Sequence, residues 1–436
     1  MFLTSCLMFF IVASQNVPEP RYAQASALVK TKFYFFGGIL KTGIITNEVW
    51  YLDLGSLSNA TIQKWSRSNA SMSVAYHSGT SCVSTIDNST ILLIGGVMYT
   101  PNTPNLNFNE KIYVFNSKKP QWNLPKIIGN TSNFVMRNKM QAVINRFGQI
   151  FISGGQNFTS NNSSSIMYND MNLLLATDHS NMLWTIPPVT GTPPTSFTQY
   201  TATLLTNNGR IVYIGGIQET QANSVNLMTK FKVFNTLSYS WSDQSTYGDV
   251  IEPRAGHSAV VQNGIIIIYG GYATNINNTL YSKVTPDVAK LDTTTWIWSI
   301  PTISKTNAPP LLALHSAALY GNYMIVAFGL NVSGSTGLTP DTNLLNNNIY
   351  ILNIQNNTWV TTIPATTTKK PTATSTKSVI TNQSSESSNH KILPIAIGIG
   401  VGGAIIVGVL SFAGYWYYKR RRRVLNSIQT PGSNMN

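Results

Sequence analysis

Few residues in this chain of 436 could carry chemistry. It has five histidines, two cysteines and 15 acidic residues, and His179 and His390 are isolated from other reactive side chains. The sequence contains no G-x-S-x-G elbow, no phosphate-cradling loop and no carboxylate pair that spacing singles out. The scarcity of acids argues against glycosidase chemistry. The remaining candidates are Tyr76-His77-Ser78 and Cys82, which share one strand region.

The elements around these candidates repeat along the chain. In five repeats an apolar strand ends in a pair of glycines. In a sixth, MIVAFGL, we place Gly329 at the first position of the pair and Leu330 at the second. The first glycines of consecutive repeats are then 55 to 61 residues apart. The pairs are Gly37 and Gly38, Gly95 and Gly96, Gly154 and Gly155, Gly215 and Gly216, and Gly270 and Gly271. A regular period of this length indicates a repeat architecture.

A tryptophan follows the first glycine of every repeat after 26 to 30 residues. These tryptophans are Trp65, Trp122, Trp184, Trp241, Trp298 and Trp359. Six residues before the tryptophan of five repeats stands an Asp or Asn, which favours a turn between two strands: Asn116, Asp178, Asn235, Asp292 and Asn353, with Asp53 before a longer loop in repeat one. Another short strand precedes each glycine pair, so every repeat predicts four antiparallel strands.

The order R-x-x-H-S-A, a strand ending in Gly-Gly, Y-x-[FL]-[DN] and then Trp resembles the kelch repeat over roughly residues 20–361. The resemblance implies an all-β, six-bladed β-propeller within residues 15–361, with repeats at about 20–66, 74–123, 137–185, 198–242, 254–299 and 311–360. The glycines would allow tight turns and the tryptophans would pack between blades, so we interpret both as structural. Six contiguous blades should close the ring, unless residues near Asn16 or Thr361 add a strand.

Kelch propellers also include galactose-oxidase-like and glyoxal-oxidase-like copper radical enzymes, and Tyr76-His77 resembles their Tyr-His copper-ligand pair. That family further needs a second tyrosine cross-linked to a cysteine, and a second histidine that galactose oxidase takes from a domain after its propeller. Here Cys82 lies in the strand region of the pair, and we place His77, His257 and His315 at matching positions of three repeats. A site residue should not recur with the blades, so we predict no cofactor, no metal site and no catalytic residue. A membrane-tethered copper radical oxidase is the enzymatic alternative.

The two ends of the sequence predict a topology. The apolar run Phe2 to Ser14 is typical of a signal peptide, residues 1–14, although an uncleaved anchor or a buried first strand is an alternative. Residues 392–418 carry no charge over 27 positions, which suits one transmembrane helix. The basic tail, residues 419–436, begins KRRRR and predicts a cytoplasmic C-terminus, hence a single-pass type I plasma-membrane protein with the propeller outside. The small-residue spacings Gly398 to Gly402 and Ala404 to Gly408 would allow a helix-mediated dimer.

Charge and composition limit the partners. The net charge is +14, but five of these charges lie in the run after the membrane span, so no basic face is evident and we predict no nucleic-acid binding. Residues 362–391 are rich in Ser and Thr and resemble a glycosylated stalk. Eleven N-x-S/T sequons are candidate glycosylation sites: Asn59, Asn69, Asn88, Asn130, Asn157, Asn161, Asn162, Asn277, Asn331, Asn356 and Asn382.

The sequence therefore predicts a cell-surface binding, recognition or adhesion module for an extracellular protein or carbohydrate. Long loops between the second and third strands of the repeats are the expected ligand surface, at residues 99–110, 156–170 and 330–348. Their Asn, Ser, Thr, Pro and Tyr residues suit hydrogen bonding to sugars or peptides. A receptor that signals through the short tail, with Ser427 and Thr430 as phosphorylation sites, is a further alternative.

Overall fold

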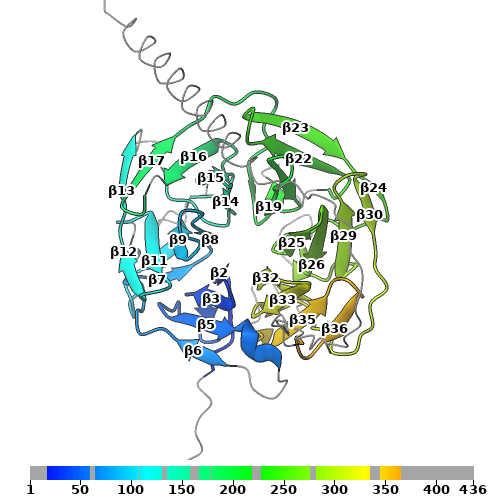
Figure 1. The fold of residues 1–436 in the computed structure, drawn as a ribbon, viewed down its shortest axis with the longest axis horizontal. Helices are drawn as coiled ribbons and strands as arrows, with labels where there is room; N and C mark the ends of the chain where they lie inside the picture. The colour runs from blue at the N-terminus through cyan, green and yellow to red at the C-terminus, as the bar shows by residue number, and fades with distance from the viewer. Residues whose placement is uncertain are drawn as a thin grey trace, which may run out of the picture. The chain divides into compact units, whose positions relative to one another are not determined.

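The computed structural model describes residues 17–58, 64–107, 109–129, 135–157, 166–176, 178–218, 227–274, 281–333 and 344–364. These residues form antiparallel sheets arranged as blades around a centre, with the last blade beside the first (Figure 1). The predicted all-β, six-bladed propeller is therefore confirmed.

Each blade has four strands, which run from the centre outward in chain order. Blade 1 contains β2 (Ala25–Val29), β3 (Lys32–Phe36), β5 (Val49–Asp53) and β6 (Trp65–Arg67), and blade 2 contains β8 (Thr80–Val83), β9 (Thr90–Ile94), β11 (Ile112–Asn116) and β12 (Gln121–Asn123). Blade 3 contains β14 (Val143–Ile144), β15 (Gln149–Ser153), β16 (Met171–Ala176) and β17 (Asn181–Thr185), and blade 4 contains β19 (Thr201–Leu205), β20 (Arg210–Ile214), β22 (Lys230–Asn235) and β23 (Ser240–Ser245). Blade 5 contains β25 (Ser258–Gln262), β26 (Ile265–Tyr269), β29 (Val288–Asp292) and β30 (Ile297–Ser299), and blade 6 contains β32 (Ser316–Tyr320), β33 (Tyr323–Ala327), β35 (Ile349–Asn353) and β36 (Thr358–Val360).

One face of the propeller carries a layer of short pairings, between the segment before each innermost strand and the segment after each second strand. The paired strands are β1 (Arg21–Tyr22) with β4 (Ile39–Leu40), β7 (Ala75–His77) with β10 (Val97–Tyr99), β18 (Phe197–Thr198) with β21 (Ile217–Gln218), and β31 (Leu312–Ala313) with β34 (Leu330–Asn331). Single bridges take their place in blades 3 and 5, and blade 5 adds β27 (Ala273–Thr274) with β28 (Tyr281–Ser282). We name this side the loop face. The opposite side, which carries the turns between first and second and between third and fourth strands, is the turn face.

The linkers between blades run along the outer strand of the next blade. β13 (Lys126–Gly129) pairs in parallel with β17, and β24 (Tyr247–Gly248) pairs in parallel with β30. The amide of Lys126 donates to the carbonyl of Ser180 in the outer turn of blade 3. After blade 6, Ile363 donates in the same way to Leu57 of η1 (Leu54–Ser58), the outer turn of blade 1. The described residues around Thr361 therefore contact blade 1 without adding a strand, and each blade is contiguous.

The hydrophobic core lies between the blades. The middle strands are buried on both faces, as in TILLI of β9 and IIIIY of β26, because each blade is covered by a neighbour on either side. The tryptophans of the outer strands pack against the preceding blade: the indole of Trp298 donates to the carbonyl of Met228 at 3.0 Å, and that of Trp122 to Ala70 at 2.9 Å. The Asp and Asn residues predicted at turns accept backbone amides there, as Asp292 does from Thr294 at 2.7 Å.

Neighbouring blades are joined through the second residue of each glycine pair. Its amide donates to a carbonyl that precedes the innermost strand of the next blade: Gly38 to Tyr76, Gly96 to Arg137, Gly155 to Phe197, Gly216 to Arg254, Gly271 to Leu312 and Gly329 to Arg21, at 2.7 to 2.9 Å. The last of these bonds joins blade 6 to blade 1 and completes the ring. Gly329 is thus a second glycine, which corrects the register in which we placed it first. Phe328 occupies the first position, with φ of 61°, and its ring packs 5.0 Å from that of Phe35 in blade 1.

The predicted signal peptide, the stalk beyond residue 364, the membrane span and the tail lie outside the described residues. Within the portion of the chain that the structure describes, no helix has the length and apolar character needed to cross a membrane.

Candidate functional site

Six residues at the loop-face mouth of the central channel form a closed ring of backbone hydrogen bonds. Five of them precede the innermost strand of their blade by two positions and Lys139 precedes β14 by four, and each donates its amide to the equivalent carbonyl of the preceding blade. The bonds run from Ala23 to Leu314, Leu314 to Gly256, Gly256 to Gln199, Gln199 to Lys139, Lys139 to Ser78 and Ser78 to Ala23, at 2.7 to 3.0 Å. All six residues have positive φ, between 53° and 63°. We name this ring the girdle.

Side chains next to the girdle fasten one blade to the blade before it. In four of the junctions the residue after the girdle position bonds to the preceding blade, three times to its innermost strand and once to the residue Gln141 just before that strand. His257 bonds through Nε2 to Thr201 Oγ1 at 3.1 Å, and His315 through Nε2 to Ser258 Oγ at 2.7 Å. Gln24 donates to Ser316 at 2.8 Å, and Tyr200 Oη accepts from the amide of Gln141 at 3.3 Å. The two histidines therefore act as structural links between blades.

Both imidazoles are neutral in the folded protein at physiological pH. Burial lowers the pKa of His315 to about 3, and burial together with the nearby Arg254 guanidinium and His315 lowers the pKa of His257 well below 6.5. An unfolded histidine titrates near pH 6.5, so below that pH the unfolded chain binds more protons than the folded one, and stability falls as the pH drops.

We expect the free energy of unfolding to fall by about 1 to 2 kcal/mol for each of the two histidines between pH 7 and pH 5. Urea titrations followed by tryptophan fluorescence at both pH values measure this loss. The His257→Gln, His315→Gln double variant should unfold with a smaller difference between the two pH values. An unchanged difference would show that other groups carry the pH dependence.

The girdle opens into a channel cavity of about 240 Å³. Its lining is mostly Ser, Thr, Gln and small residues, and within the part of the chain that the structure describes Lys139 is the only lining residue with a full charge at neutral pH. No Asp or Glu lines the cavity, and among the described residues no acidic side chain lies within ion-pairing distance of Lys139. Burial lowers the pKa of Lys139 below its usual 10.5. The mouth thus presents a cation whose hydration is reduced and whose charge no described acidic residue balances.

His77 lies beside this cation. Its Nδ1 bonds to Ser78 Oγ at 2.8 Å, and its ring stacks on Tyr99 with centroids 6.3 Å apart. Burial and then the charge of Lys139 lower the pKa of His77 to about 4, so the imidazole is neutral at physiological pH. His77 and Tyr99 are both partly exposed.

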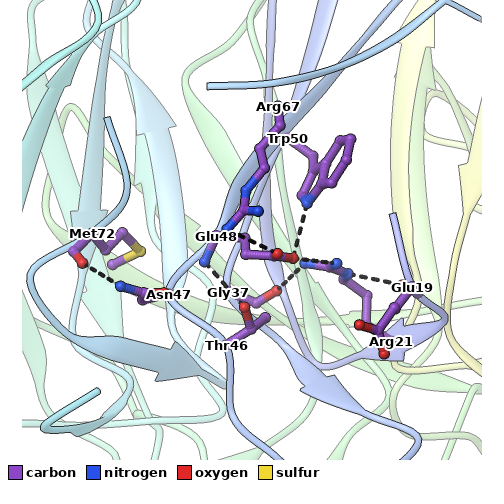
Figure 2. A network of polar contacts seen from close by, with 9 residues as sticks. All are labelled: Glu19, Arg21, Gly37, Thr46, Asn47, Glu48, Trp50, Arg67 and Met72. Carbon is purple, nitrogen blue, oxygen red and sulfur yellow. Dashed lines mark hydrogen bonds and ion pairs between the residues drawn. The ribbon is translucent and has the colours of Figure 1, made fainter. Parts of the chain in front are cut away.

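Three buried arginines donate hydrogen bonds to main-chain carbonyls near the loop face. Arg21, Arg137 and Arg254 precede equivalent strands of blades 1, 3 and 5, and each donates Nη1 to the carbonyl of the first glycine in its own blade, at 3.0 to 3.3 Å. Arg21 also pairs with Glu48 at 2.9 Å, and Figure 2 shows Arg21 and Arg67 approaching that carboxylate from different sides. Burial would raise the pKa of Glu48, but bonds from Trp50 and Arg21 outweigh it and hold the pKa below its usual range.

Among the described residues, the structure does not bring Tyr76, His77 and Cys82 together as a set of copper ligands. Tyr76 is fully buried between blades 1 and 2, its hydroxyl has no hydrogen-bond partner among the described residues, and burial raises its pKa far above 10. Cys82 packs in a different cluster, between blades 2 and 3. No group of three or more His, Cys, Asp or Glu that could hold a metal occurs in the described ranges.

The structure also corrects the alignment of the histidines. His257 and His315 each follow a girdle residue, whereas His77 precedes its girdle residue, Ser78, and so stands two positions earlier. The shared dipeptide His-Ser suggested a common register that the backbone does not have. The girdle itself escaped sequence analysis, because its members are Ala, Ser, Lys, Gln, Gly and Leu, which share no chemical type.

Sequons occur on both faces of the propeller. Asn69, Asn88 and Asn356 are exposed, and Asn157 and Asn331 are partly buried, each with its side-chain oxygen accepting a backbone amide. Asn59, Asn130, Asn161, Asn162, Asn277 and Asn382 lie outside the described residues. The expected ligand loops are described only in part, at residues 99–107, 109–110, 156–157, 166–170, 330–333 and 344–348.

Comparison with known proteins agrees with this geometry. The family model of the KLHDC2/KLHL20/DRC7 Kelch-repeats domain matches residues 79–281 and 211–386, which together make up more than half of the chain. The chain belongs to the Kelch-repeat family. Its propeller is also similar to that in the structure titled "Structure of YjhT", with a TM-score of 0.57 and 12% identity over 79% of this chain and 98% of that one.

Several curated proteins share the repeat. The Acyl-CoA-binding domain-containing protein 5 of Arabidopsis thaliana is 23% identical over 72% of this chain and 45% of its own length. The Rab9 effector protein with kelch motifs of Homo sapiens is 26% identical over 42% of this chain and 44% of its own length. Kelch domain-containing protein 3 of Rattus norvegicus is 28% identical over 41% and 45%. The chain thus spans just under half the length of these relatives.

Proposed function

We propose that this Kelch-repeat propeller is a binding module displayed on the cell surface, with its ligand held at the girdle mouth of the loop face. The observation that carries the proposal is Lys139, a partly buried cation without an acidic partner among the described residues, at the rim of a polar cavity. An acidic group of a ligand that docks there would supply the missing charge. Because the hydration of Lys139 is already reduced, the charge-assisted hydrogen bond would form with little further loss of water from the ammonium group.

Protein is the favoured ligand class. One relative is named as a Rab9 effector, which is a protein-directed role. The mouth adds His77 and Tyr99 as a partly exposed ring pair, which suits contact with a peptide. An acidic carbohydrate shares the anionic group and is the second candidate for the same cation.

The surface location rests on the sequence. The uncharged stretch 392–418, the KRRRR that follows it, the signal-like run at residues 1–14 and the sequons all favour a type I plasma-membrane glycoprotein. Protease added to intact cells should remove the propeller, and glycosidase treatment should increase the mobility of the chain on a gel. Protection from protease, or an unchanged mobility, would contradict this location.

The ligand is tested with the full-length chain on arrays of extracellular proteins and glycans. We expect binding that Lys139→Glu weakens at least tenfold, because the substitution places a negative charge against an anionic ligand. Lys126→Glu, on the exposed outer edge of blade 3, is the control and should leave binding unchanged. Silence on both arrays would count against a binding module.

A further inference from the structure

The turn face carries exposed apolar residues in a place where polar ones are expected. Ile86, Phe147 and Leu237 stand in turns of blades 2, 3 and 4, and their side chains are 51%, 62% and 67% exposed. Tight turns favour Gly, Asn, Asp, Pro and Ser. The local folding of the turns therefore does not explain why three neighbouring blades each carry a large apolar side chain there.

The three turns lie side by side. His179 in the outer turn of blade 3 bonds through Nε2 to Ser84 in the turn of Ile86, at 2.9 Å. Gln149, directly after the turn of Phe147, donates to Tyr239 Oη in the turn of Leu237, at 3.3 Å. Next to Ile86, Thr85 Oγ1 lies 3.5 Å from the place that a Cβ on Gly148, the neighbour of Phe147, would take. The three exposed apolar residues therefore stand in neighbouring turns of three blades, which we call the strip.

A cleft opens within the strip, between blades 3 and 4. It has a volume of about 130 Å³ and is lined by three turns, 145–147, 206–209 and 236–237, together with Leu204. Phe147 of blade 3 and Leu237 of blade 4 both line it, and Leu204 belongs to the first strand of blade 4. The cleft is large enough for one aromatic or branched aliphatic side chain.

The turns that hold this cleft are rigid. Asn145 Oδ1 accepts the amides of Phe147 at 3.0 Å and Gln149 at 3.1 Å. Asn235 Oδ1 accepts the amide of Leu237 at 2.9 Å. The exposed side chains thus project from fixed backbone, and a partner that covers them loses little conformational entropy on binding.

The charge around the cleft has one sign. Arg146 is exposed, its guanidinium stands 4.7 Å from the centre of the Phe147 ring, and it is the only charged residue that lines the cleft among those described. Arg210, also exposed, begins the strand that leaves the second turn. An occupant that places a carboxylate beside its apolar side chain would match both features of this rim.

We propose that the cleft between blades 3 and 4 on the turn face is a second docking site, which binds a partner protein through one large apolar side chain next to an acidic residue. It is separate from the girdle mouth, because it lies on the opposite face and uses no girdle residue. The sequons described on the turn face, Asn88 and Asn356, belong to blades 2 and 6, so the cleft itself contains none.

The test uses purified full-length chain and a random dodecapeptide library displayed on phage. Selected peptides should share an aromatic or large aliphatic residue next to Asp or Glu. The Phe147→Ser, Leu237→Ser double variant should bind them at least tenfold more weakly, and Arg146→Glu should reject them in favour of basic peptides. The matched control is Tyr247→Ser, Val250→Ser, which removes two equally exposed apolar residues from the rim of blade 5 and should bind as the wild type does.

The variants alter exposed side chains only, so their urea midpoints should equal that of the wild type and exclude misfolding as a cause. Peptides without an acidic residue, or peptides that bind wild type and double variant equally, would overturn the proposal. Sedimentation measures whether the chain binds a copy of itself through the cleft. If the wild type self-associates and Leu237→Ser restores a monomer, the occupant is a second copy of the chain and the proposed partner is refuted.

Discussion

The variant Gly270→Ala should lose about 4 kcal/mol of unfolding free energy, the largest effect that we expect from a single methyl group in this propeller. Gly270 is the first glycine of its pair, with φ of +70°, and a Cβ there would overlap the carbonyl oxygen of Leu312 in the next blade. Because that carbonyl accepts the amide of Gly271, the overlap cannot relax without opening the junction between blades 5 and 6.

Gly321→Ala is the matched control. Gly321 also has positive φ, +57°, but no neighbouring atom lies within 4 Å of the place that an added methyl group would take. It should lose only the conformational cost of a left-handed alanine, about 1 to 2 kcal/mol. Urea titration of both variants measures the difference. Equal losses would mean that φ alone makes these glycines necessary and that the blade contact adds nothing.

Arg21→Met should lose about 3 kcal/mol. The Arg21 side chain is fully buried and donates to the carbonyls of Glu19 and Gly37 and to the carboxylate of Glu48, at 2.9 to 3.1 Å (Figure 2). Methionine fills a similar length but donates nothing, so a buried carbonyl and part of a carboxylate lose their partners.

Arg67→Met tests the same carboxylate from the solvent side. Arg67 pairs with Glu48 at 3.1 Å, but its side chain is 48% exposed, so its loss should cost under about 1 kcal/mol. Thermal or urea unfolding of the two variants separates the effect of a buried donor from that of a surface ion pair. A loss for Arg67→Met as large as that for Arg21→Met would contradict this assignment.

The blade pattern was readable from the sequence because it depends on residues that few others can replace at their positions. Glycine pairs mark where the next blade approaches the backbone, and tryptophans mark outer strands that pack on the preceding blade. The register of blade 6 was not readable, because Phe328 adopts a left-handed conformation that a bulky residue rarely takes, and the pattern therefore assigned Gly329 to the first place. The aromatic contact with Phe35 that accompanies this exception spans the ends of the repeat array, where no local pattern could reveal it.

The candidate sites were less accessible to sequence analysis. The expected surface, the long loops between second and third strands, is described only in part, and Lys139 carried no motif that set it apart from other lysines. Its significance comes from what the other five blades place around it, which is polar and without acids. In the cleft on the turn face, the turn of Phe147 likewise meets two turns of blade 4 that follow it by about 60 and 90 residues in the chain, so only the assembled ring brings Phe147 and Leu237 together.

The girdle has one more consequence, which concerns how such a protein can change over time. Its six amides and six carbonyls satisfy one another, so the aperture is defined by main-chain atoms and does not depend on which side chains are attached. Ala, Ser, Lys, Gln, Gly and Leu all occupy it in this one molecule. Substitutions at the six girdle positions can therefore change the side chains around the opening, and with them the ligand, while the width of the aperture stays the same.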